Sequence, residues 1–293
     1  MIAKRKLAVF VFLLTLGAAV PLAADIRFEL GFGWTMVKPA LNAGYVNQYA
    51  PPLTVAPAVP PPPDRYIGSS ASQTVWFKGK TTYGMNGFFN VLFTETIGLQ
   101  VLADYHRPGL GDGGKNSLYE IEMQILAFEP ETYERSDDWP ASKGNLTQTT
   151  FSLNALARFR VANNLSLSLS GGPSVFHLEG KGGFIGYTFF NLDYIDTEYE
   201  LSGGTYQMVV DFGPQTKYGF NIGIEAAYEA FQHVILAFDI RWYGAPRSDL
   251  QLHIVEDDAI QHPIDQIENT IGLGTLTVNP SYFRAGLAIR FIF

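Results

Sequence analysis

The chain has 293 residues, of which 14% are aromatic and only 16% are charged, with 20 Lys and Arg against 28 Asp and Glu. This length allows one large or two small domains, and the composition excludes both a disordered chain and a typical charge-rich soluble surface. The formal charge of −8 argues against nucleic-acid binding, and the absence of Cys excludes disulfides and thiol catalysis.

The N-terminus has the three parts of a secretory signal. Residues 4–6 are Lys-Arg-Lys, residues 7–16 are apolar, and residues 21–24 include small residues suited to cleavage. A membrane-anchoring helix is the alternative, but the apolar run is short for a bilayer, and strand periodicity begins directly after it. We therefore expect a cleaved signal peptide at 1–24 and a single mature domain at 25–293. That domain has 17 Lys and Arg against 28 Asp and Glu, a formal charge of −11.

Eight stretches of the mature domain alternate apolar and polar residues with the period of two that is typical of a β-strand. In the first, Phe28, Phe32 and Trp34 share the apolar face, while Arg27 and Glu29 lie on the other. The eight stretches are 25–37, 82–93, 97–106, 147–161, 165–176, 217–229, 234–243 and 282–293. About 9–11 tilted residues are enough for one strand to cross a bilayer, and these stretches are of that length.

The connections between these stretches alternate strictly between short and long. Residues 94–96, 162–164 and 230–233 are short turns, whereas the other four connections have roughly forty residues each. Transmembrane barrels alternate in this way, with short periplasmic turns and longer extracellular loops. Both ends of the mature domain then lie on the side of the short turns.

Aromatic residues gather near the two ends of the predicted strands. The band at the long-connection end contains Trp34, Tyr83, Tyr105, Tyr218, Trp242 and Phe283. The band at the short-turn end contains Phe28, Phe93, Phe159, Phe291 and Phe293. A soluble β-sandwich also alternates, but its aromatic residues would gather in the middle of the core, so the two bands favour interfacial girdles.

The last stretch reads YFRAGLAIRFIF and ends on an aromatic residue. Gly286, Ile289, Phe291 and Phe293 resemble the closing-strand signal of bacterial outer-membrane β-barrels. Together with the eight strands, they make the mature chain resemble the eight-stranded outer-membrane barrels, such as the transmembrane domain of OmpA, OmpX and OmpW. No sequence signature selects one of these subfamilies.

The resemblance implies an all-β fold: a transmembrane, antiparallel, up-and-down barrel of eight strands with short periplasmic turns and four long extracellular loops. It also implies location in the bacterial outer membrane and contact with outer-membrane lipid and lipopolysaccharide. In that family the closing strand is recognised by the barrel-assembly machinery. We expect a monomer that binds no cofactor, no metal and no nucleic acid.

Charged residues on the polar phase of the strands are expected to form an interior ion network. An eight-stranded barrel is only wide enough inside for side chains, so buried charges there must pair. The predicted network contains Arg27, Glu29, Asp104, Arg158, Arg160, Glu225, Asp239, Arg241, Arg284 and Arg290. Because the first and eighth strands must be neighbours, Glu29 is predicted to pair with Arg290. The seventh and eighth strands are also adjacent, which predicts that Asp239 pairs with Arg284.

The four long connections are expected to be surface loops. The first, 38–80, is rich in Pro, which favours a disordered loop over a protein-binding segment. The second contains 119–128, predicted to be a strand extension above the membrane, and the acidic 129–138, predicted to be a solvated loop without metal-ligand spacing. The third, 179–216, is rich in Tyr and Phe and forms either a β-extension or a cap. In the fourth, residues 256–258 could bind calcium or cation-bridged lipopolysaccharide, but the pattern is not specific.

Three functions remain open at the level of sequence. The preferred hypothesis is a structural or surface-interaction barrel whose lumen is closed by the ion network. The alternatives are a narrow channel for small or hydrophobic solutes and a lipid-modifying enzyme. Catalysis is disfavoured because His106 is the only His on a predicted inward face, and an interior hydrogen-bonding role is expected for it.

Overall fold

The structure is a computed structural model of the chain, and it describes residues 26–49, 53–55, 66–111, 117–126, 130–139, 143–195, 198–257 and 275–293. The expected signal peptide lies outside these residues. All regular secondary structure in the described part is β-strand. No helix among the described residues is long and apolar enough to cross a membrane.

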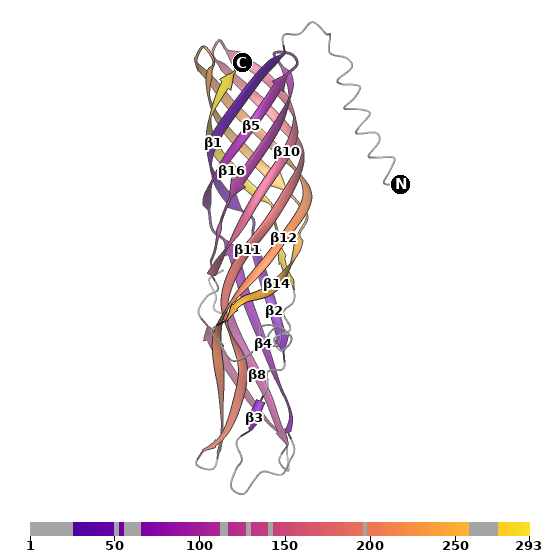
Figure 1. Cartoon of the computed structure of the whole chain (residues 1–293), viewed down its shortest axis with the longest axis vertical. Helices are drawn as coiled ribbons and strands as arrows, with labels where there is room; N and C mark the ends of the chain where they lie inside the picture. Colours follow the sequence, from indigo (N-terminus) through magenta and orange to yellow (C-terminus); the bar gives the residue numbers. More distant parts are fainter. Residues whose placement is uncertain are drawn as a thin grey trace, which may run out of the picture.

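Eight strands form a barrel and eight further strands extend it at one end (Figure 1). The barrel strands are β1 (Arg27–Pro39), β5 (Thr82–Leu92), β6 (Ile97–His106), β10 (Lys143–Ala162), β11 (Leu165–Ile195), β12 (Glu198–Phe231), β13 (Val234–Gly244) and β16 (Tyr282–Ile292). The further strands are β2 (Asn42–Tyr49), β3 (Leu53–Val55), β4 (Tyr66–Gly79), β7 (Gly109–Gly111), β8 (Ser117–Leu126), β9 (Pro130–Trp139), β14 (Ser248–Asp257) and β15 (Thr275–Val278).

The eight barrel strands pair in a closed antiparallel ring. Each pairs with its neighbour in chain order, and β1 pairs with β16 to close the ring. Following the register from Phe28 once around all eight strands leads back to β1 at Lys38, ten residues further along. With ordinary strand spacings, that stagger corresponds to a strand tilt of roughly 40° and a barrel radius of about 8 Å. The predicted fold is therefore confirmed, and the interior has room only for side chains.

The alternating polar and apolar residues of each strand point alternately to the inside and the outside of this ring. On β1, Glu29, Thr35 and Val37 are buried, while Phe32 and Trp34 are exposed on the outer surface. Apolar side chains therefore face outward along the barrel and polar ones inward, the reverse of a soluble barrel. The narrow interior also demands small residues, because a Cβ built at Gly31 would lie 2.2 Å from Cζ of Phe88.

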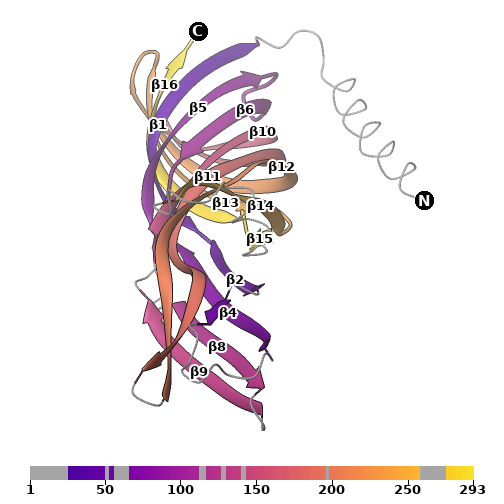
Figure 2. The same cartoon turned by 60° about the horizontal axis from the view of Figure 1, so that its bottom comes forward.

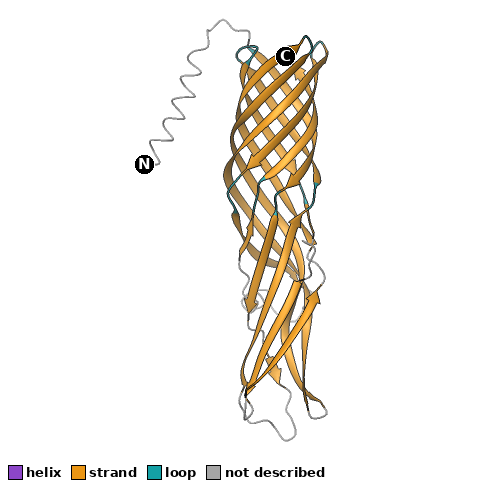
Figure 3. Cartoon of the chain, turned by 180° about the vertical axis from the view of Figure 1, so that it is seen from behind, coloured by secondary structure: helices purple, strands orange, loops and turns teal. Residues whose placement is uncertain are grey.

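The short and long connections lie at opposite ends of the molecule (Figure 3). The turns after β5, β10 and β12 are tight, as predicted. At the other end, β11 and β12 continue as one hairpin far beyond the barrel, pairing to Ile195 and Glu198. β4, β8 and β9 form a second group of paired strands beside it (Figure 2). The β-extension considered for the third connection is thus confirmed.

Two expectations for the long connections need revision. The first is not simply a disordered loop, since β2 and β4 form a ladder across it, although its Pro60–Pro63 run lies outside the described residues. In the second, β8 confirms the predicted strand, but the acidic segment expected to be a solvated loop is strand β9. The prediction missed β9 because it relied on hydrophobic alternation. β9 is a charged strand at the edge of the sheet, and only one of its edges is paired. In the fourth, β14 runs to Asp257, and Asp258 lies outside the described residues.

Candidate functional site: the polar interior of the barrel

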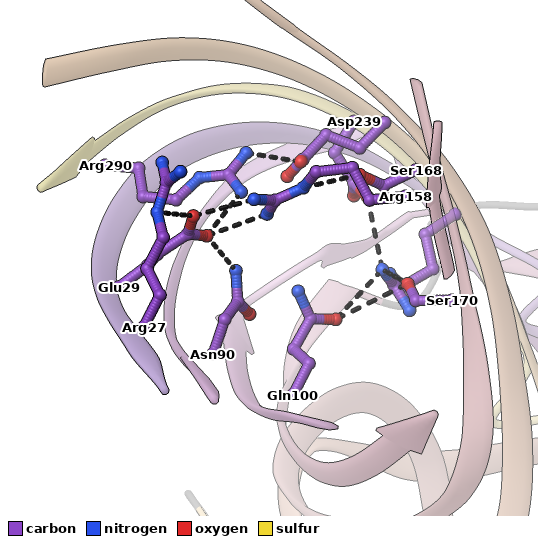
Figure 4. A network of polar contacts seen from close by, with 11 residues as sticks. Arg27, Glu29, Asn90, Gln100, Arg158, Ser168, Ser170, Asp239 and Arg290 are labelled. Carbon is purple, nitrogen blue, oxygen red and sulfur yellow. Dashed lines mark hydrogen bonds and ion pairs between the residues drawn. The ribbon is translucent and has the colours of Figure 1, made fainter. Parts of the chain in front are cut away.

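The interior near the short turns is organised around the carboxylate of Glu29 on β1. Arg158 of β10 reaches across the lumen and donates Nη1 and Nη2 to its two oxygens at 2.7 and 2.8 Å. Arg290 of β16 donates Nη1 at 2.8 Å, Arg27 lies 3.1 Å away, and Asn90 donates Nδ2 at 3.0 Å. Figure 4 shows these side chains pointing toward Glu29 from different sides of the ring. Side chains from four strands therefore meet at one carboxylate that has no solvent exposure.

A second carboxylate completes this level. Arg290 also pairs with Glu225 of β12, so the same guanidinium joins two acids. The side chains of Arg290 and Arg158 are 0% and 9% exposed, whereas Arg27 is 35% exposed at the rim. Charge-assisted bonds of this kind are strong when they are shielded from water, and an unpaired member would be costly.

The middle of the barrel is filled mainly by uncharged polar side chains. Asn154 donates to Gln100 at 3.0 Å, and Asn221 donates to Asn154 at 2.7 Å. Arg241 joins this group through Asn221, Gln100 and Ser170, with its Nη2 2.6 Å from the Ser170 hydroxyl. Amide side chains both donate and accept, so they can link strands β6, β10 and β12 without adding charge.

A second ionic level lies closer to the extension. Arg284 of β16 contacts Asp104 at 3.2 Å and Asp239 at 2.8 Å, and Arg241 lies 3.3 Å from Asp239. The hydroxyl of Tyr243 donates to Asp104. These groups are almost completely buried, so Arg284 holds β6, β13 and β16 together from inside.

An aromatic layer separates these charges from an apolar interior beyond them. Tyr243 and Tyr282 stack with ring centroids 4.3 Å apart, and Phe176 meets both rings edge-on. His106, 1% exposed, packs against Tyr282 at 4.4 Å. Past this layer most buried side chains are apolar, and they include Leu41, Phe77, Leu110, Leu146, Leu178, Phe212, Leu250, Leu252, Leu276 and Val278. The interior thus changes from ionic to hydrocarbon where the strands leave the barrel.

The structure brings together most of the residues expected in the ion network. Both predicted ion pairs are present, each at 2.8 Å: Glu29 with Arg290 and Asp239 with Arg284. Arg160 is the exception, because it is exposed and lines the mouth at the short-turn end instead of the closed interior. Arg160 lies two residues beyond Arg158 on β10. At that position β10 has already passed the level of the lumen that the side chains around Glu29 fill.

Sequence reasoning missed the uncharged partners and Tyr243. Asn90, Gln100, Asn154 and Asn221 all occupy the polar phase of their strands, and that phase was the available signal. Tyr243 was treated only as the end of a strand, although it falls on the same phase as Arg241 and Asp239.

All six residues predicted for the upper girdle are exposed on the outer surface, from 42% for Trp242 to 84% for Tyr83. The strand register, the rise per residue and the strand tilt place these six residues roughly 15–26 Å from Phe28 along the barrel axis. This distance matches the apolar band of about 25 Å that is typical of transmembrane barrels. Of the residues proposed as the assembly signal, Ile289, Phe291 and Phe293 also face outward, and Gly286 lies against Trp34 and Thr35 of β1. The backbone N–H of Phe293 donates to the carbonyl of Phe28 at 2.9 Å, so the final residue takes part in closing the ring.

Within the described residues no group of three or more His, Asp and Glu is arranged to hold a metal ion.

No protein-family model matches the chain, and no curated protein matches it. Solved structures give only distant similarities. The outer membrane protein OprG from Pseudomonas aeruginosa is 9% identical, with 90% of this chain and 95% of that chain covered and a TM-score of 0.42. Ail of Yersinia pestis is 10% identical, with coverage of 90% and 98% and a TM-score of 0.32. The outer membrane protease OmpT from Escherichia coli is 9% identical, with coverage of 92% and 98% and a TM-score of 0.35.

With TM-scores below 0.5, these similarities do not decide the architecture, which follows from the chain's own strand pairing. The ring is closed and staggered by ten residues, its outer surface is apolar between two aromatic bands, and its interior is polar. An apolar outer surface of this kind requires hydrocarbon around it. The chain therefore folds as a closed eight-stranded antiparallel β-barrel of the transmembrane type, with an apolar outer surface and a polar interior.

Proposed function

We propose that the protein is a non-enzymatic outer-membrane barrel with a sealed lumen, which carries a β-extension on the cell surface for interaction with its surroundings. The observation that carries the proposal is the buried level around Glu29. Three arginines from three strands reach one carboxylate, and Arg158 crosses the lumen to do so. Side chains bound to each other across the inside of a barrel of about 8 Å radius leave no straight aqueous path.

The apolar interior beyond Tyr243 and Tyr282 supports a second seal. Leu146, Leu178 and Phe212 are buried there with exposed fractions of 0–1%. Ions and polar solutes are excluded from such a layer because they would lose hydration without gaining new partners. The two seals are chemically different, so removing the charges at one level is not expected to open the other.

The extension supports a role outside the membrane. β11 and β12 have 31 and 34 residues, far more than a strand needs to cross a bilayer. The part of β11 from His177 to Ile195 alone corresponds to about 60 Å of extended strand. A paired hairpin of that length presents a surface well beyond the lipid headgroups, as expected for a protein that contacts other molecules.

The experiment is planar-bilayer conductance of the refolded protein, with liposome swelling as an independent measurement. A sealed lumen should give neither steady conductance nor uptake of small sugars. The double variant Glu29→Ala/Arg290→Ala should also remain closed, because the apolar layer is intact. A steady conductance in the unmutated protein would contradict the seal and favour the narrow-channel alternative.

Catalysis is tested separately. His106 is enclosed by the aromatic layer, which supports a packing role for it. The folded protein and its His106→Ala variant, incubated with outer-membrane lipids, should leave identical lipid profiles. Loss of a modified lipid species in the variant alone would overturn the non-enzymatic part of the proposal.

A further inference from the structure

A groove of about 330 Å³ lies on the outer surface of the wall, just beyond the aromatic girdle. It is lined by Arg107 after β6, by Asn145 and Thr147 on β10, by residues 179–181 of β11, which include Glu179 and Lys181, and by residues 211–214 of β12, which include Asp211. Arg107 follows the girdle residue Tyr105 by two positions on the same outward face. The groove is therefore separate from the lumen and lies at the depth where lipid headgroups meet a transmembrane barrel.

The local backbone explains why the wall is hollowed here. The register between β11 and β12 shifts between Leu178 and Gly180, where the partner residues jump from Gln215 to Phe212. Gly213 has a positive φ of 97°, a conformation that favours glycine, and a Cβ there would lie 2.7 Å from the carbonyl oxygen of Leu178. A bulge of this type bends the strand and changes the direction of nearby side chains.

Cations form an arc that leads into the groove. Lys38 at the end of β1, Lys80 before β5 and Arg107 after β6 are all exposed on neighbouring strands, directly beyond the girdle. Lys181 continues the arc on β11, where it makes an exposed contact of 3.5 Å with Asp211. Such a contact is weak, so the Lys181 ammonium can exchange partners at small cost.

The guanidinium of Arg107 is held in place before any ligand arrives. Its Nε and Nη2 donate to Oδ1 of Asn145 at 3.1 and 2.9 Å. Within the described part of the chain no carboxylate is paired with it. A fixed planar guanidinium with unused N–H groups is suited to phosphate oxygens, which it can bind in bidentate fashion.

We propose that this groove and its arc of cations bind the phosphorylated sugar headgroup of an outer-leaflet glycolipid. The acyl chains would lie against the apolar wall below, where Tyr105 and Val101 are exposed. The phosphate would bind the guanidinium of Arg107, with the ammonium groups of Lys80 and Lys181 on either side. Asn145 and Thr147 offer hydrogen-bonding groups of the kind that sugar hydroxyls use. The groove lies outside the lumen, so the proposed lipid site does not depend on the proposed seal.

The test measures binding of the folded barrel, in detergent micelles, to bisphosphorylated lipid A and to the same lipid with both phosphates removed. Each cation near a membrane surface is worth about 1 kcal/mol, which converts to roughly a fivefold change in Kd. Arg107→Gln should therefore weaken binding of the phosphorylated lipid roughly fivefold, and Lys80→Gln/Arg107→Gln roughly 25-fold. Neither change should affect binding of the dephosphorylated lipid.

Arg160→Gln is the matched control, because it removes one exposed cation at the opposite end of the barrel. It should leave lipid affinity unchanged, and heat-dependent gel mobility should show that all variants are folded. Equal affinity for the two lipids, or an equal effect of Arg160→Gln, would overturn the proposal. Displacement of the lipid by millimolar inorganic phosphate would indicate a site for the free anion and would also refute the lipid assignment. Conductance measured on the same variants reports on the lumen alone.

Discussion

Removing either partner of the Glu29–Arg290 pair should destabilise the barrel strongly, and removing both should cost less than the two changes added together. Among the described residues, Glu29→Ala leaves Arg158 with only a 3.5 Å contact to Ser168, while Arg290 keeps Glu225. Arg290→Ala leaves Glu225 without the only ion-pair partner it has among the described residues. Each single change therefore leaves one buried charge without its partner, and each should lower the free energy of unfolding by roughly 3–5 kcal/mol.

The register explains why the double variant should recover part of this cost. Arg158 pairs across β10 and β11 with Ser168, and Ser168 pairs across β11 and β12 with Glu225. The two charges that remain thus flank the same small residue on the same side of the wall. An arginine side chain is long enough to reach over a serine, so Arg158 and Glu225 can pair with each other. We expect a coupling energy of about 1–3 kcal/mol.

The assay is urea unfolding of the four proteins in lipid vesicles, followed by Trp fluorescence and gel mobility. Arg160→Ala serves as the control, because Arg160 is exposed at the mouth, and it should change the free energy of unfolding by less than about 0.5 kcal/mol. Strict additivity of the two single changes would refute the reasoning, because it would mean that Glu29 and Arg290 do not share a network.

Three further predictions concern assembly, packing and location. Deleting Phe293 or changing it to Asp should reduce insertion into the outer membrane, measured as folded protein in membrane fractions; undiminished assembly would show that the terminal aromatic is not recognised. Gly172→Ala should cost about 1–3 kcal/mol, because its Cβ would lie 2.0 Å from the carbonyl oxygen of Leu153, whereas Gly109→Ala, with open space around it, should be neutral or slightly stabilising in the same urea titration. Cell fractionation should recover the mature chain with the outer membrane and with heat-dependent mobility; recovery as a soluble periplasmic protein would contradict the membrane assignment.

The barrel could be predicted from sequence because each of its strands is defined by local alternation. The predicted stretch 97–106 coincides with β6, and 234–243 differs from β13 by one residue. Closure then requires the first and last strands to be neighbours, and this topological fact was enough to find the pair of Glu29 and Arg290.

Contacts across the lumen could not be predicted in the same way. Arg158 binds Glu29 although β10 and β1 are not adjacent, so the contact depends on the stagger of all the strands between them. The stagger of ten residues is a property of the whole ring, and no single stretch of sequence encodes it. The same reason explains why Arg160, on the inward phase, was wrongly assigned to the interior.

The strands of the extension were harder still. Residues 130–139 are acidic and irregular, yet they form β9 because β8 offers them an unpaired edge. β8 itself depends on β4, which lies in a connection where proline suggested disorder. Strand formation here follows from neighbours far away in the chain, and the sequence pattern of each segment alone is ambiguous.

The continuity of β11 and β12 from the barrel into the extension has a mechanical consequence. A pulling force applied to the far end of this hairpin acts along the strands, parallel to the ladders that join β11 to β10 and β12 to β13. Detaching the hairpin would require the inter-strand hydrogen bonds of both ladders to shear together instead of opening one at a time. The barrel wall thus gives the surface hairpin an anchorage that resists tension, and the buried ion pair between Glu225 of β12 and Arg290 of β16 must break in the same event.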